Sequence, residues 1–187
     1  NAIPELIHAI NDAERIGDHA ENLERTRKQI KEVEQRLFDI CGSYKEYELL
    51  QTMPGFGPYV SAVVLGAIGF ARRFDNGKQL LRLAGLDLCA SRSGKTSQTA
   101  LPVISKAGKA DLRYALYQAA KVATSRTAEF KTYFEHLLKG RQKERGIKTK
   151  MRVKVSAKML VIAWTLMKTM QTYKSGLLAI DEPVQPR

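Results

Sequence analysis

The chain has 187 residues and a formal net charge of +12, and its two cysteines exclude a disulfide scaffold or a cysteine-rich zinc site. Residues 1–50 hold 7 Lys/Arg against 11 Asp/Glu (net −4), whereas residues 51–187 hold 24 against 8 (net +16). A basic charge confined to one region is typical of nucleic-acid binding. No apolar run reaches the roughly 18 residues of a membrane helix. We therefore expect a cytoplasmic protein with no membrane contact.

The first 50 residues predict one long helix, in which Gly17 is the point where a break could occur. Apolar residues recur there every seven positions, at Ile16, Leu23, Ile30 and Leu37. In the second half of the helix a further apolar residue follows three positions later, at Val33 and Ile40. Such a heptad seam favours a coiled-coil arm that pairs chains into a homo-oligomer or braces a neighbouring domain. The alternative is a helix packed against its own globular domain.

From residue 49 the pattern predicts an all-α domain that contains one irregular insertion and ends near residue 175. The expected division is therefore an arm over residues 1–48, a helical domain over 49–175 and a flexible tail over 176–187. A polar loop is expected over residues 85–108, with a strand-like piece at 100–104, and a basic connector over 140–150. Apolar spacing predicts the helices of the domain at residues 47–52, 59–69, 74–86, 111–125, 129–139 and 154–173.

The run Met53-Pro54-Gly55-Phe56-Gly57-Pro58 predicts a tight turn between two of these helices. Gly55 and Gly57 can adopt positive φ and let a phosphate approach the backbone. The start of the following helix adds free N–H donors and a favourable dipole. The stretch from Leu50 to Tyr59 is similar to the hairpin of a helix-hairpin-helix motif. The alternative is an ordinary structural connector.

The polar loop is rich in serine and in cations. A serine can attack a phosphate when a base activates it and nearby donors stabilise the developing charge. No histidine lies in the loop to act as that base, so composition alone favours a loop that only contacts phosphate. The alternative for its later part is a solvated basic face. The residues expected to bind nucleic acid here are Arg92, Lys95, Lys106, Lys109 and Arg113.

Several short motifs occur in a fixed order: Pro54-Gly55-Phe56-Gly57, Leu83-Ala84-Gly85-Leu86, Ser93-Gly94, Ile104-Ser105-Lys106-x-Gly108 and Leu112-Arg113-x-Ala115-Leu116-Tyr117. With them, the stretch from Leu50 to about Tyr173 resembles the C-terminal transposase domain of bacterial insertion-sequence transposases. Those proteins carry an N-terminal RuvC-like DEDD domain and are bridge-RNA-guided recombinases. Two departures from the family pattern are Leu88, where proline is common, and a slightly longer segment from Ser93 to Ile104.

This resemblance implies a function for the chain. Ser93 would be the nucleophile that forms a covalent link to DNA, while acidic residues of the RuvC-like domain hold magnesium. DNA and a guide RNA would be the partners. The chain opens on Asn1 rather than methionine, and we expect a fragment that binds DNA without cutting it. The alternative is a non-catalytic helix-hairpin-helix module that binds nucleic acid.

A second, shorter resemblance covers the N-terminal helix. The stretch from Asn11 to Asn22 resembles the metal-binding helix of PhoU-type phosphate-uptake regulators. Glu14 and Asp18 are four residues apart, so their carboxylates lie on one helix face and could bind a hard metal ion. This resemblance implies a metal-dependent regulator as a third interpretation of function. The alternative is a solvated, charged helix face.

Overall fold

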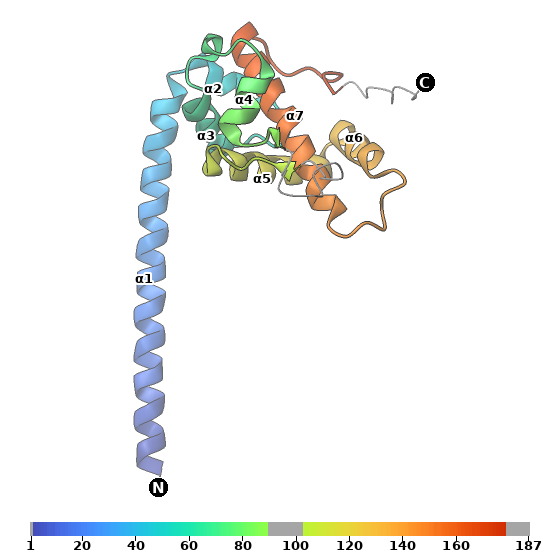
Figure 1. Ribbon diagram of the computed structural model, residues 1–187. Coiled ribbons are helices and arrows are strands. Elements are labelled where there is room, and N and C mark those ends of the chain that lie inside the picture. The colour runs from blue at the N-terminus through green and yellow to red at the C-terminus, as the bar shows by residue number, and fades with distance from the viewer. Residues whose placement is uncertain (1, 90–102, 179–187) are drawn as a thin grey trace. The chain divides into compact units, whose positions relative to one another are not determined.

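The computed structural model describes the backbone of residues 2–89 and 103–178, and the side chains of residues 20–88 and 103–178. The chain divides into two compact units, Asn1–Ile40 and Cys41–Arg187. Figure 1 shows that both are built from helices, with one very short pair of strands. The prediction of an all-α fold is confirmed. No helix in the described ranges is both long and apolar enough to span a bilayer.

The first unit consists of helix α1 (Ala2–Gly42) as far as Ile40, and the helix runs through Gly17 without a break. Four of its heptad side chains are open to solvent: Leu23, Ile30, Val33 and Ile40 are 52–65% exposed. Pairing of this apolar stripe with another helix remains a prediction. The second unit begins at Cys41, before the expected boundary at residues 48 and 49, because Cys41, Tyr47 and Leu49 are buried.

The second unit contains the remaining helices and both strands. Helix α4 begins after Asn76, later in the sequence than expected, since the side-chain oxygen of Asn76 accepts from the N–H groups of Lys78 and Gln79. Gly85 ends the same helix with φ +64°, so α4 is shorter than the predicted 74–86. The elements are α2 (Lys45–Gln51), α3 (Pro58–Ile68), the 3-10 turn η1 (Ala71–Arg73), α4 (Gly77–Ala84), β1 (Leu88–Cys89), β2 (Val103–Ile104), α5 (Ala110–Arg126), α6 (Ala128–Leu138) and α7 (Ile147–Thr169).

Helix α5 lies at the centre of the second unit and packs against α3, α4, α6 and α7. Alanines on its buried face, among them Ala119 and Ala123, leave room for neighbouring backbones. Helix α7 supplies a long buried face that includes Met159 and Leu160, and it starts at Ile147, inside the expected basic connector. The indole N–H of Trp164 on α7 donates to the carbonyl of Ala71 at 2.7 Å, which fixes η1 to this helix. Helix α5 therefore links the elements on both sides of the polar loop.

Candidate nucleic-acid interface

The turn between α2 and α3 is a type II turn. The N–H of Phe56 donates to the carbonyl of Met53 at 3.0 Å, with Pro54 in the second position. Gly55 in the third position has φ +83°, as this turn type requires. A side chain there has no space either, because a Cβ atom would lie 2.4 Å from the carbonyl oxygen of Ala119 on α5. The predicted positive φ at Gly55 is confirmed, and packing against α5 gives it a second cause.

Gly57 differs from Gly55. Its φ of −82° and ψ of 177° are extended values that any residue adopts, so the positive φ expected there is wrong. Gly57 is the N-cap of α3, and a Cβ atom added to it would meet nothing within 4 Å. The surroundings of this residue are therefore open.

The first turn of α3 leaves hydrogen-bond donors free. The N–H of Ser61 closes the first helical bond to the carbonyl of Gly57, and Pro58 has no N–H. Within the described part of the chain, the N–H groups of Gly57, Tyr59 and Val60 have no acceptor. Such groups, together with the positive end of the helix dipole, attract anions. This region can therefore hold a phosphate in the way the sequence predicts.

A surface depression joins the turn to the end of α5, where Val122 and Thr127 face the stretch 51–57. Two exposed cations adjoin these residues in sequence, Lys121 and Arg126. The sequence interpretation missed both. Val122 and Thr127 reach the turn because α5 packs against Gly55, which no local spacing reveals.

The segment after α7 holds the residue that precedes the turn. The N–H of Tyr173 donates to Thr52 Oγ1 at 2.8 Å, and the hydroxyl of Tyr173 donates to Glu129 Oε2 at 2.8 Å. Burial, and then this bond to Glu129, raise the pKa of Tyr173 well above its ordinary value. Gly176 donates to the same carboxylate and Leu178 is buried, so these two residues of the expected flexible tail are held in place.

The polar loop begins and ends in an antiparallel ribbon. Leu88 pairs with Ile104 and Cys89 with Val103, which confirms the strand expected within 100–104. Below the ribbon, the hydroxyl of Ser105 donates to the carboxylate of Asp87, and its N–H donates to the Asp87 carbonyl at 2.9 Å. The chain on either side of residues 90–102 is therefore brought together. Three predicted site residues lie outside the described residues: Ser93, Arg92 and Lys95.

Next to the ribbon, two segments of backbone cross in contact. A Cβ atom at Gly108 would lie 2.3 Å from the nitrogen of Gly85 and 2.4 Å from the carbonyl oxygen of Leu83. Two hydrogen bonds fasten the crossing, from Lys106 N–H to the Gly85 carbonyl (3.0 Å) and from Lys109 N–H to the Leu83 carbonyl (2.8 Å). The side chains of Lys106 and Lys109 are exposed and available to a phosphate.

Arg113 has a structural role that the sequence did not predict. Its Nη1 donates to the carbonyl of Ala84 at 2.9 Å and to that of Gly108 at 3.3 Å. The guanidinium thus bridges the end of α4 and the segment at Gly108 that crosses it. Phosphate binding by Arg113, as predicted, has to use its remaining N–H groups.

The predicted metal ligands Glu14 and Asp18 lie four residues apart in α1, and their side chains are outside the described residues. Among the side chains that the structure does describe, no group of three or more His, Cys, Asp or Glu is arranged to hold a metal ion. The magnesium expectation concerns a RuvC-like domain and stays a prediction.

The second unit is thus a helical module that presents open backbone donors at a glycine turn and exposed cations near a ribbon. Residues 47–135 match the family model described as "Transposase IS116/IS110/IS902 family". The matched segment runs from α2 into α6 and contains both the turn and the ribbon. The match supports an insertion-sequence transposase, and hence a transposase or recombinase in general. No curated protein matches the chain.

Proposed function

We propose that this chain binds DNA during transposition and supplies Ser93 as the nucleophile of strand exchange. The observation that carries the proposal is the transposase family match over residues 47–135, which includes the glycine turn and the serine-bearing loop. The excess of 24 Lys/Arg over 8 Asp/Glu in residues 51–187 supports contact with a polyanion. A guide RNA is the second nucleic acid in this proposal.

In the proposed reaction, the hydroxyl oxygen of Ser93 attacks the phosphorus of a DNA phosphodiester. A bond from serine oxygen to phosphorus forms, and the bond from phosphorus to one deoxyribose oxygen breaks. The serine proton passes to a base, and the released deoxyribose oxygen takes up a proton. Magnesium, expected in a RuvC-like domain, would stabilise the charge that develops on the phosphate.

The duplex would be held by the open N–H groups of the α3 start and by the cations beside the loop. The donors of Gly57, Tyr59 and Val60 suit one backbone phosphate. Lys106 and Lys109 suit phosphates nearer the ribbon. These contacts carry no sequence information, so the proposal leaves target choice to base pairing with the guide RNA.

The nucleophile is tested with the chain joined to the RuvC-like domain that the resemblance implies. We expect Ser93→Ala to abolish the covalent protein–DNA adduct on a denaturing gel while DNA affinity stays within about twofold. Ser91→Ala is the matched control and should keep the adduct. An intact adduct and unchanged strand exchange in Ser93→Ala would refute the assignment and favour a non-catalytic module.

We also propose that α1 joins two copies of the chain. Its exposed stripe carries Ile30 and Val33, flanked on one side by Arg27 and Glu34. In an antiparallel pair with Ile30 beside Val33 of the second copy, each Arg27 lies beside a Glu34. A parallel pair would place both charges beside uncharged Asn22 and Gln29. The charge pattern therefore favours the antiparallel pair.

The pairing is tested by the molar mass of the chain in light scattering. We expect a dimer for the wild type and a monomer for Ile30→Lys. Lys28→Ile, on the opposite face, is the control that should stay dimeric. A monomeric wild type at about 100 μM would overturn the proposal.

A further inference from the structure

An open groove lies at the foot of the ribbon, separate from the depression at the glycine turn. Its walls come from three parts of the fold. Leu86 and Ile104 contribute from the ribbon side, Tyr114 and Tyr117 from α5, and Val153 from α7. The groove is thus mostly apolar, and it adjoins the point where the polar loop leaves and re-enters the described chain.

The two tyrosines are the unusual feature of this groove. Tyr114 is 62% exposed and Tyr117 is half-buried, so the ring of Tyr114 contributes little to the core. They are three residues apart on α5 and therefore share a helix face. Within the described chain, neither hydroxyl has a hydrogen-bond partner. An exposed aromatic ring in an apolar groove is suited to a flat ligand that stacks on it.

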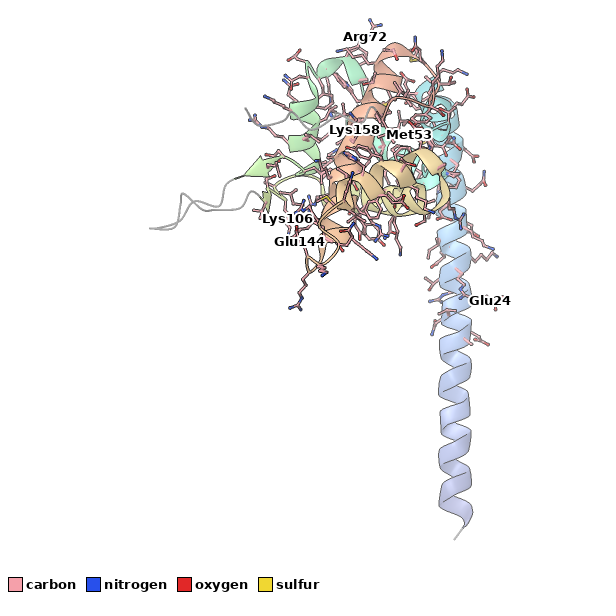
Figure 2. The ribbon with its side chains drawn as sticks, turned by 90° about the vertical axis from the view of Figure 1, so that its right-hand side faces the viewer. Glu24, Met53, Arg72, Lys106, Glu144 and Lys158 are labelled. Carbon is pink, nitrogen blue, oxygen red and sulfur yellow. The ribbon has the colours of Figure 1, made fainter. Side chains whose placement is uncertain are left out.

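Cations predominate around the groove. Arg113 lies in its wall, and Lys106 and Lys109 lie in the segment between the ribbon and α5. Figure 2 shows Lys106 near the strands. The acids in the same segments are Asp87, whose carboxylate accepts a bond from Ser105, and Asp111. On α7, Lys148 and Lys150 flank the groove residue Thr149, and Arg152 and Lys154 flank Val153.

We propose that this groove binds single-stranded nucleic acid, with an unstacked base on the ring of Tyr114 and the adjoining phosphates on the lysines. The inference rests on the proposed nucleic-acid binding and specifies the form of the substrate. Within a duplex both faces of each base are covered by its neighbours, so stacking on a side chain requires an unpaired strand. A strand opened for exchange, or an unpaired guide RNA, has this form.

The experiment measures fluorescence anisotropy of the 187-residue chain with a labelled dT20 strand and with a duplex of the same length. We expect Tyr114→Ala to weaken dT20 binding by about fivefold or more, because one base–aromatic stack contributes this much. Tyr114→Phe keeps the ring and should bind within twofold of the wild type. Tyr44→Ala removes a similarly exposed tyrosine (51%) outside the groove and is the matched control. Thermal melts check that each variant is folded.

A second measurement locates the contact. A dT20 strand with 5-iodouracil, irradiated on the wild type, should crosslink to the peptide that contains Tyr114 and Tyr117. Equal dT20 affinity of Tyr114→Ala and wild type, or an equal loss in Tyr114→Phe, would overturn the stacking contact. Competition gives a further test, because polyglutamate carries negative charge but no bases. If polyglutamate and unlabelled dT20 displace the labelled strand equally well at the same concentration of charges, the stacking contact is likewise overturned. If duplex binding persists in any of these cases, the proposed function stands, whereas loss of all nucleic-acid binding by the wild type removes both.

Discussion

The Gly55 turn and the Gly85–Gly108 crossing lie against different ends of α5, and they differ in what surrounds their backbones. At the crossing, the amides of Gly85, Lys106 and Lys109 all donate to carbonyls, and there is no room for a side chain. At the turn only Gly55 is enclosed, while Gly57 and the start of α3 stay open. The crossing supports the loop, and the turn offers donors to a ligand. Glycines that look equivalent in the sequence thus divide into those required by packing and those left accessible.

The largest effect is expected at the crossing. Gly108→Ala should lower the free energy of unfolding by about 3 kcal/mol or more, because its Cβ would overlap three backbone atoms that hydrogen bonds hold in place. Urea denaturation measures the change. Gly66→Ala in α3 is the control: nothing lies within 4 Å of its added Cβ, and it should stabilise the chain by about 0.5–1 kcal/mol. A Gly108→Ala protein as stable as wild type would show that the crossing can separate.

At the turn, a pair of variants separates packing from binding. Gly55→Ala should cost about 2–3 kcal/mol of stability, from its positive φ and the contact with Ala119. Gly57→Ala should cost less, about 0.5–1 kcal/mol, because its φ is ordinary and the space is free, and only the preference for glycine over alanine at an N-cap is lost. Parallel urea curves measure both. Similar losses of stability at the two positions would mean that the space around Gly57 at the start of α3 is not open.

Arg113 sharpens the distinction between support and binding. Arg113→Met should cost about 1–2 kcal/mol, because the carbonyls of Ala84 and Gly108 lose a charged donor. Lys109→Met should leave stability within about 0.5 kcal/mol but reduce the slope of log affinity against log salt for duplex DNA by about 1. If instead Arg113→Met reduced the salt slope and Lys109→Met lowered the stability, Arg113 would be the phosphate ligand and Lys109 the structural residue.

The smallest effect concerns the segment that holds Thr52 beside the turn. The pKa of Tyr173 is raised in the folded chain, so above about pH 10 the unfolded tyrosine loses its proton while the folded one keeps it. This contribution to stability is therefore complete below about pH 10 and declines as pH rises. Tyr173→Phe should flatten the decline between about pH 9.5 and pH 11 in thermal melts. Identical pH profiles for the two proteins would indicate that Tyr173 is neither buried nor bonded to Glu129 as described.

The sequence predicted the elements whose signal is local. Apolar spacing gave α3, α5 and α6 within a few residues, and the heptad stripe of α1 was visible as such. It did not give β1, since two residues carry no pattern and Leu88 pairs with Ile104 only after the chain has closed on itself. The role of Arg113 was missed for a related reason, because Ala84 lies 29 positions away. The positive φ of Gly55 could be predicted from the turn sequence. The lack of space for a side chain there could not, because the carbonyl of Ala119 reaches Gly55 only through long-range packing.

One buried side chain gives these experiments a common optical signal. Trp164 is the only tryptophan in the chain, and it lies in the second unit with its indole bonded to Ala71. Its emission should shift to longer wavelength when water reaches the ring, and the first unit contributes no indole fluorescence. Circular dichroism, in contrast, records α1 together with the other helices. A difference between the two signals during one denaturation would reveal whether the first and second units lose their structure in one step or in two.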